Sequence, residues 1–338
     1  MPRLSSPKLS KARRPNFARK FFLVVAMIIM MPVLFSAYLG AQMYKLPTRA
    51  EDAVIFIPMN SSLAKIMSIL YEHKAIENEL TFSLCYRAAH TVYGKHIIAG
   101  EYMVPQSLRP YEVLGLLLSG NVLKRQVTIP EGLSLKQIIE ILDDTYGLQG
   151  QIAVSNYQEG NVMPDTYQYV YGTHKHAILD RMRNSMQTFL ESAWQQRVQP
   201  HLLQTPEQAL ALASIVELEA MVPQERGRIA ALYLRRLQIG MRLQADPTVL
   251  YAVSRGSNKL PRQLLYSDLQ YDSPYNTYRY TGLPPTAIAA PSRDSIIAVL
   301  QSSPSEELFF VADGSGGHRF ARNYKEHQKN VADYRRLR

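Results

Sequence analysis

The sequence contains very little cysteine. Cys85 is the single cysteine among 338 residues, so the chain cannot form an internal disulfide. A disulfide-stapled scaffold and a structural zinc site built from several thiolates are therefore both excluded. The sequence also lacks an HExxH motif, a paired CxxC and a glycine-rich phosphate loop, so metal and nucleotide chemistry have no basis in it. We expect neither a metal nor a cofactor.

Acidic side chains are absent from residues 1–20, which carry seven basic residues: Arg3, Lys8, Lys11, Arg13, Arg14, Arg19 and Lys20. These seven account for most of the net charge of +10 and leave only +3 for the other 318 residues. Positive and negative charges nearly cancel over these 318 residues, so we expect no large basic surface of the kind that DNA- and RNA-binding domains use. We therefore expect no nucleic-acid partner.

Charged residues are also absent from the 21 residues of Phe21–Ala41. An α-helix rises about 1.5 Å per residue, so this run spans roughly 30 Å, the thickness of the hydrocarbon core of a bilayer. A proline such as Pro32 is tolerated better in a membrane helix than in a soluble one. We expect residues 21–42 to form a transmembrane anchor. Residues 1–20 would form a cytoplasmic tail, because positive charges stay on the cytoplasmic side.

A cleaved signal peptide is the alternative interpretation, because the apolar run ends among small residues: Ala37, Gly40 and Ala41. The run is, however, longer than the apolar segment of about 7–15 residues that is typical of signal peptides, which favours a retained anchor. No later apolar run reaches 18 residues. The sequence thus predicts a single-pass membrane protein with a cytoplasmic N-terminus and an exported main part.

Two segments of that main part resemble each other. Residues 57–70 (IPMNSSLAKIMSIL) and 129–142 (IPEGLSLKQIIEIL) agree at seven of fourteen positions, and residues 104–117 carry a weaker version. In both, a β-rich stretch ends at a proline, and Ser62 or Ser134 is placed to cap an amphipathic helix. The similarity is either a coincidence of two such helices or a repeated strand–loop–helix unit, as in glycan-binding modules of the LysM type.

The strongest helix signal begins at Pro206, with Thr205 as the expected N-cap. We expect its buried side to consist of Leu210, Ala213, Ile215, Val216 and Ala220. Glu217 lies at the edge of that apolar face, whereas Glu219 is rotated about 200° from it. A partly desolvated carboxyl group keeps its proton to higher pH, as a general acid requires, although an ordinary surface glutamate fits the spacing equally well.

Two later segments are rich in polar and aromatic side chains. Residues 240–251 (GMRLQADPTVLY) contain Gln244 and Asp246 beside a Pro-Thr turn. Residues 273–285 (SPYNTYRYTGLPP) bring together Tyr275, Asn276, Thr277 and Tyr278. Aromatic faces with amides and hydroxyls are common partners of sugar rings, but a tightly packed loop would explain the same composition.

The chain resembles the endolytic murein transglycosylase family, also called the YceG-like family, from the basic tail to near the C-terminus. The resemblance rests on these ordered motifs: VTIPEG (127–132), MPDTY (163–167), LASIVELEA (212–220), ER..IA (225–230), GMRLQADPTVLY (240–251), SPYNTY..TGLPP (273–285) and FFVADGSGGHRF (309–320). The chain departs from the family pattern at Thr286-Ala287, where Gly-Pro is common. It also departs at Ala290 and Ser292, where Asn and Gly are common.

The resemblance implies a membrane-anchored lytic transglycosylase, a carbon–oxygen lyase that cleaves MurNAc–GlcNAc bonds in nascent peptidoglycan and leaves 1,6-anhydroMurNAc ends. Glu217 falls on the family's catalytic position and would be the acid and base. Residues expected to bind the strand or support the site are Glu219, Glu225, Arg226, Gln244, Asp246, Tyr275, Asn276, Thr277 and Tyr278. Implied partners are glycan strands, the inner membrane and cell-wall synthases. The alternative is a non-enzymatic peptidoglycan-binding tether.

Together these observations predict an α+β fold. The transmembrane helix would be followed by a LysM-like module at residues 46–122 and a mixed α/β catalytic domain at residues 123–338. The second LysM-like repeat, near residues 127–145, would lie inside the catalytic domain. Between the second LysM-like repeat and the helix that begins at Pro206, residues 159–176 have the composition of a loop. Residues 177–198 have the pattern of a helix.

Overall fold

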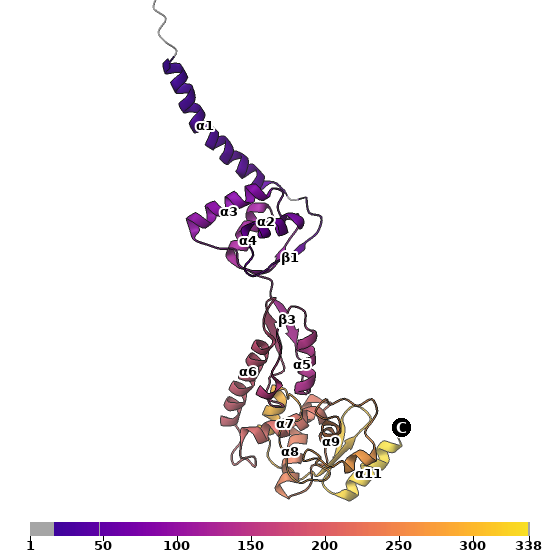
Figure 1. Ribbon diagram of the computed structural model, residues 1–338. Helices are drawn as coiled ribbons and strands as arrows, with labels where there is room; N and C mark the ends of the chain where they lie inside the picture. The colour runs from indigo at the N-terminus through magenta and orange to yellow at the C-terminus, as the bar shows by residue number, and fades with distance from the viewer. Residues whose placement is uncertain (1–16, 47, 337–338) are drawn as a thin grey trace, which may run out of the picture. The chain divides into compact units, whose positions relative to one another are not determined.

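The structure is a computed structural model that describes residues 17–46 and 48–336 (Figure 1). The chain forms two compact units, divided between Leu123 and Lys124. We refer to them as the first unit and the second unit. The basic tail expected at residues 1–20 lies outside the described residues as far as position 16.

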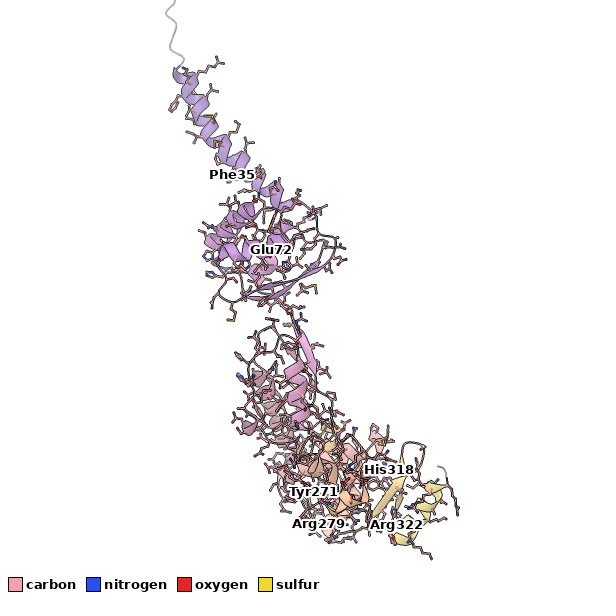
Figure 2. The ribbon with its side chains drawn as sticks, turned by 45° about the vertical axis from the view of Figure 1, so that its right-hand side comes forward. Phe35, Glu72, Tyr271, Arg279, His318 and Arg322 are labelled. Carbon is pink, nitrogen blue, oxygen red and sulfur yellow. The ribbon has the colours of Figure 1, made fainter. Side chains whose placement is uncertain are left out.

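Helix α1 (Phe17–Tyr44) opens the first unit. Its apolar side chains are exposed along most of its length, and Phe35, labelled in Figure 2, is 53% exposed. From Arg19 to Tyr44 the helix is long and apolar enough to cross a membrane. So extended an apolar surface is unfavourable in water, and the prediction of an apolar N-terminal helix is confirmed. Its length and composition are consistent with a single-pass anchor.

The rest of the first unit contains two strands and three helices: β1 (Ala53–Ile57), α2 (Leu63–Glu72), α3 (Glu79–Tyr93), β2 (Gly100–Val104) and α4 (Pro110–Ser119). The strands pair antiparallel, with Ala53 opposite Val104 and Ile57 opposite Gly100. Side chains alternate along a strand, so Ile55 and Ile57 of β1 both reach the core. The core also contains residues from all three helices, among them Leu70, Phe82 and Leu117.

The predicted N-caps of the two similar segments are confirmed. The Ser62 side chain accepts a hydrogen bond from the Lys65 amide at the start of α2. The Ser134 side chain accepts one from the Gln137 amide at the start of α5 (Leu135–Asp144), and the Gln137 side chain accepts one from the Ser134 amide. Such caps satisfy amides that have no partner within the helix. The two segments differ afterwards, because α2 is followed by a second helix, α3, before the next strand.

The N-terminal part of the second unit is a small α/β layer. Strands β3 (Arg125–Thr128) and β4 (Thr166–Tyr169) pair antiparallel, and α5 and α6 (Lys175–Gln195) share a core with them. The expectation of a loop over residues 159–176 is therefore wrong at β4. A strand of four residues that follows a Pro-Asp pair is too short to give a clear alternating pattern.

Four helices form the centre of the second unit: α7 (Pro206–Glu219), α8 (Arg226–Gln238), α9 (Asp246–Val253) and α10 (Arg293–Leu300) (Figure 1). Thr205 caps α7 through the Gln208 amide, as predicted. The residues expected on its buried side, Leu210, Ala213, Ile215, Val216 and Ala220, are all buried. The intervening residues Ala209, Ala211, Leu212 and Ser214 are buried as well, so α7 is a core helix enclosed on every side.

A C-terminal hairpin and helix complete the second unit. Strands β5 (Phe309–Ala312) and β6 (His318–Ala321) pair antiparallel, and α11 (Tyr324–Arg335) packs on both. Three short 3₁₀ helices lie in the connections: η1 (Val154–Asn156), η2 (Pro223–Glu225) and η3 (Tyr266–Gln270). The described part of the chain is thus a mixed α/β structure with three separate two-stranded sheets, which agrees with the predicted class.

Candidate active site

Glu217 lies in the last turn of the enclosed helix α7. Its side chain is only 7% exposed. Because the helix ends two residues later, at Glu219, the carboxylate lies where the core opens rather than inside it. A carboxylate at this depth needs hydrogen-bond donors to remain charged.

Both oxygens of the Glu217 carboxylate have donors from other helices. Oε1 accepts a hydrogen bond from Arg226 Nη2 at 3.2 Å. Oε2 accepts two, one from the Ser292 amide at 2.9 Å and one from the Ser292 hydroxyl. Arg226 is the first residue of α8, and Ser292 is the N-cap of α10. The C-terminal end of α7 therefore meets the N-terminal ends of two other helices, which favour a negative charge.

A loop from the α/β layer lies against the same carboxylate. Gly132 has a positive φ of 74°, and a Cβ atom at this position would lie 3.3 Å from Leu218 and 3.8 Å from Glu217. Backbone hydrogen bonds of 2.8 Å hold the loop in place, from the Gly132 amide to Ala290 and from the Ala290 amide to Leu133. Glycine is required here for both its backbone conformation and its size. This contact brings the VTIPEG motif to Glu217.

Three carboxylates surround the single guanidinium of Arg226. Besides Glu217, Glu131 and Asp294 each lie 3.8 Å from it. Sequence reasoning identified Arg226 but missed Glu131, Asp294 and Ser292. Glu131 could have been found, because it belongs to a quoted motif. Ser292 could not, because it is 75 residues from Glu217 and no local pattern connects the two.

The prediction that Glu217 has a raised pKa is wrong. Burial does raise the pKa, but hydrogen bonds from the hydroxyl and the amide of Ser292, together with the charge of Arg226, outweigh it. The pKa of Glu217 therefore lies below its usual value. The sequence revealed the burial but not the donors. At neutral pH the group is ionised, which is the state that accepts a proton.

Glu219 lines a pocket of about 310 Å³ together with Gln244, Asp246 and Tyr278. Four of the predicted supporting residues are therefore brought together there. The Tyr278 hydroxyl donates to Asp246 at 2.6 Å, and the Tyr233 hydroxyl donates to Glu219 at 3.2 Å. Burial and the nearby charge of Asp246 raise the pKa of Glu219 to about 7.

Glu225 is held by the C-terminal hairpin. It accepts hydrogen bonds from the His318 amide at 3.0 Å and from His318 Nδ1 at 2.7 Å. His318, labelled in Figure 2, is the first residue of β6. A Cβ atom at Gly317 would lie 3.1 Å from the Glu225 carboxylate, so the turn of the hairpin approaches it closely. Glu225 thus anchors the hairpin, while its neighbour Arg226 contacts Glu217.

Most of the polar side chains named in the predicted loop at residues 273–285 form hydrogen bonds with neighbouring parts of the chain. Asn276 is fully buried and donates to the carbonyls of Leu269 and Tyr271, at 3.0 and 2.7 Å. The buried Thr277 hydroxyl accepts a hydrogen bond from the Ala245 amide at 3.0 Å. The Tyr275 hydroxyl lies 2.9 Å from that of Thr286. These residues fix the shape of the loop, and Tyr278 alone among them lines the pocket.

Metal-binding side chains do not cluster in the part of the chain that the structure describes: no group of three or more histidine, cysteine, aspartate or glutamate residues there could hold an ion. The centre around Glu217 is instead built from a carboxylate, a guanidinium, and the hydroxyl and amide of the serine that caps α10. Such a centre can hold a negative charge and exchange a proton.

Comparison with known proteins finds several similar chains. The chain is 30% identical over 317 residues to a Bacillus subtilis protein named endolytic murein transglycosylase, covering 83% of this chain and 84% of that protein. It is 28% identical to a Streptococcus pneumoniae (serotype 2) protein of the same name, but spans only 57% of that protein's length. A crystal structure of a yceG-like protein from Listeria monocytogenes shares 26% identity, with a TM-score of 0.52 over 82% of this chain and 98% of that one. The sequence model of the YceG-like family matches residues 55–333, and the chain therefore belongs to that family.

Proposed function

We propose that this chain is a membrane-anchored endolytic lytic transglycosylase, a carbon–oxygen lyase that cleaves MurNAc–GlcNAc bonds in nascent peptidoglycan strands and so ends their elongation. The names of its relatives support this activity. The observation that carries it here is Glu217, a carboxylate 7% exposed at the meeting point of three helix ends. Glycosidic bond cleavage needs a carboxyl group held in such a defined position.

Glu217 is sufficient for this reaction as a single acid and base. Hydrolases of glycosides normally use two carboxyl groups, because one of them activates water or attacks the sugar. In a lytic transglycosylase the C6 hydroxyl of the muramyl residue is the nucleophile. Glu217 protonates the oxygen that leaves C1, then accepts the proton of the C6 hydroxyl as the C6 oxygen bonds to C1. The product is a 1,6-anhydro ring, and no water is consumed.

Because the pKa of Glu217 is low in the free protein, glycan binding must raise it before Glu217 can act as an acid. Before it can act as an acid, the carboxylate has to take up a proton. A sugar covering the site removes water from the carboxylate, and desolvation disfavours the charged form. The nearby carboxylates of Glu131 and Asp294 compete for Arg226, which limits its stabilisation of the Glu217 charge. Bound glycan would therefore raise the pKa of Glu217 toward neutrality.

The remaining polar residues would bind or shape the glycan site. Arg226 would act indirectly, by holding the Glu217 carboxylate, because its Nε atom is buried and out of reach of a glycan. The pocket of Glu219, Gln244, Asp246 and Tyr278 combines amide, carboxyl and aromatic groups suited to a sugar. The supporting residues would act by fixing loops: Tyr275, Asn276 and Thr277 in one, and Glu225 in the hairpin.

The first unit would bind glycan as a LysM-like module at residues 46–122. Its order of strand, two helices and strand, with the two strands antiparallel, supports this proposal. A second LysM-like repeat would begin the catalytic domain of residues 123–338, near residues 127–145. We place α1 in the inner membrane with the N-terminus in the cytoplasm, and residues 46–338 in the periplasm, where cell-wall synthases would be partners.

Product analysis tests the proposed activity. The full chain in detergent micelles is incubated with purified sacculi, and the released fragments are identified by mass spectrometry. We expect new 1,6-anhydroMurNAc ends in fragments cut from within strands. Reducing MurNAc ends would instead indicate hydrolysis. Binding to sacculi without new ends of either kind would indicate a tether.

A further inference from the structure

Ser292 contacts the Glu217 carboxylate in an unusual way. Its amide and its hydroxyl both donate to the same oxygen, Oε2. The Ser292 hydroxyl oxygen also accepts a hydrogen bond from the Ser295 amide at 3.1 Å, as the N-cap of α10. A hydroxyl has one hydrogen and two lone pairs, so it can accept the bond from Ser295 and still donate its hydrogen to Glu217. Ser292 is only 2% exposed, so water does not compete for these bonds.

This geometry makes the two oxygens of Glu217 unequal. Neither the Ser292 amide nor the Arg226 guanidinium can accept a hydrogen bond, so a proton on either oxygen weakens the bonds which that oxygen accepts. On Oε2 these are two short bonds from Ser292. Oε1 has one donor, Arg226 at 3.2 Å, on a flexible side chain that also faces Glu131 and Asp294. A proton on Glu217 is therefore more stable on Oε1.

We propose that Ser292 is a positioning residue that holds Oε2 of Glu217 and so makes Oε1 the oxygen that exchanges the proton with the glycan. The proposal rests on the proposed function of Glu217. It assigns the hydroxyl a role beyond capping α10. The buried bond orients the carboxyl group, and it stabilises the ionised form.

Removal of the Ser292 hydroxyl should raise the pKa of Glu217. The charged groups that face Glu217 from the packed elements are Arg226 of α8, Asp294 of α10 and Glu131 of the preceding loop, and all three are unchanged in such a variant. Ser292→Gly keeps the backbone amide, and glycine is tolerated at an N-cap. The ionised form of Glu217 loses one donor, so its pKa rises. Because the acid must be protonated to react, activity then persists to higher pH.

The test compares Ser292→Gly with Thr205→Gly, which removes a capping hydroxyl from the other end of the Glu217 helix. Both variants of the full chain in micelles are assayed on purified glycan strands, and kcat/KM for anhydro-end formation is measured against pH. In Ser292→Gly we expect the alkaline limb to move up by about one pH unit, the size expected for one hydrogen bond to a charged group. Thr205→Gly should leave the limb in place while both variants lower the melting temperature.

Two outcomes would overturn the proposal. One is an active Ser292→Gly enzyme whose alkaline limb coincides with that of the wild type. The other is an equal shift in Thr205→Gly, which would make the effect a general consequence of a weakened helix. Absence of anhydro ends with the wild-type chain would instead contradict the proposed function, so the two failures are distinguishable.

Discussion

Glu217 and Glu219 are two residues apart on α7, yet their environments shift their pKa values in opposite directions. Glu217 is surrounded by donors that stabilise its charge. Glu219 is near Asp246, and a single tyrosine hydroxyl donates to it. The end of α7 therefore carries one carboxyl group that is charged near pH 7 and one that is about half-protonated.

Glu219 should make the second unit less stable as the pH rises. Its pKa is about 7 in the folded chain and near 4.5 when unfolded, so the folded state binds more protons between these values. Stability is then lost from about pH 5 upward and is lowest above pH 7. Glu219→Gln removes this dependence, and we expect it to raise the free energy of unfolding by about 2 kcal/mol more at pH 8 than at pH 5.

Urea unfolding followed by tryptophan fluorescence measures this difference, because the single tryptophan, Trp194, lies on α6 and reports on the second unit. Burial also raises the pKa of Glu159 to about 7. Glu159 is unchanged in the variant, so the pH dependence of stability that remains in Glu219→Gln includes its contribution. An equal effect of Glu219→Gln at pH 5 and pH 8 would contradict the assigned environment.

Gly132 offers a second prediction at the residue scale. Gly132→Ala and Gly172→Ala both place a Cβ atom on a residue with positive φ, but only at Gly132 does it meet neighbours, Leu218 and Glu217. Both should lose about 1 kcal/mol of stability from backbone strain. Only Gly132→Ala should also lower the rate of anhydro-end formation, by up to about tenfold, because its Cβ atom would crowd Leu218, the neighbour of Glu217, at 3.3 Å. Equal rates in the two variants would contradict a tight contact at Gly132.

At the scale of elements, the helix starts could be predicted and the enclosure of α7 could not. Ser62, Ser134 and Thr205 were identifiable as N-caps because capping depends on local sequence. The expected buried face of α7 was correct but incomplete, since other helices cover its remaining sides. Strand β4 was missed, and so was the meeting of three helix ends, because both depend on pairing between distant segments.

The β5–β6 hairpin allows a prediction about a single element. Glu225→Ala removes both acceptor oxygens, so both hydrogen bonds to His318 are lost. We expect a cost of about 1–2 kcal/mol and faster hydrogen exchange in residues 309–321. Exchange at the end of α7 should stay near the wild-type rate. Uniform loss of protection across the second unit would contradict a local anchoring role.

At the scale of the whole molecule, the chain combines an apolar helix, a small first unit and a larger second unit that carries Glu217. If residues 46–122 hold glycan, deletion of these residues should weaken binding to sacculi about tenfold or more, because two linked binding sites gain avidity. Unfolding of the second unit, followed through Trp194, should change little. Unchanged sacculus binding would indicate that the first unit has a packing role only.

The most direct test of the account is the product yield of Glu217→Gln at equal folded protein, with Glu219→Gln as the matched control on the same helix. Glutamine keeps the shape of the side chain but cannot deliver and retrieve a proton. Loss of general acid–base catalysis typically costs about 10²–10⁴-fold in rate. We therefore predict that Glu217→Gln binds sacculi but releases almost no anhydroMurNAc ends, while Glu219→Gln keeps most of the yield. Near-wild-type yield from Glu217→Gln, together with its loss in Glu219→Gln, would contradict the assignment.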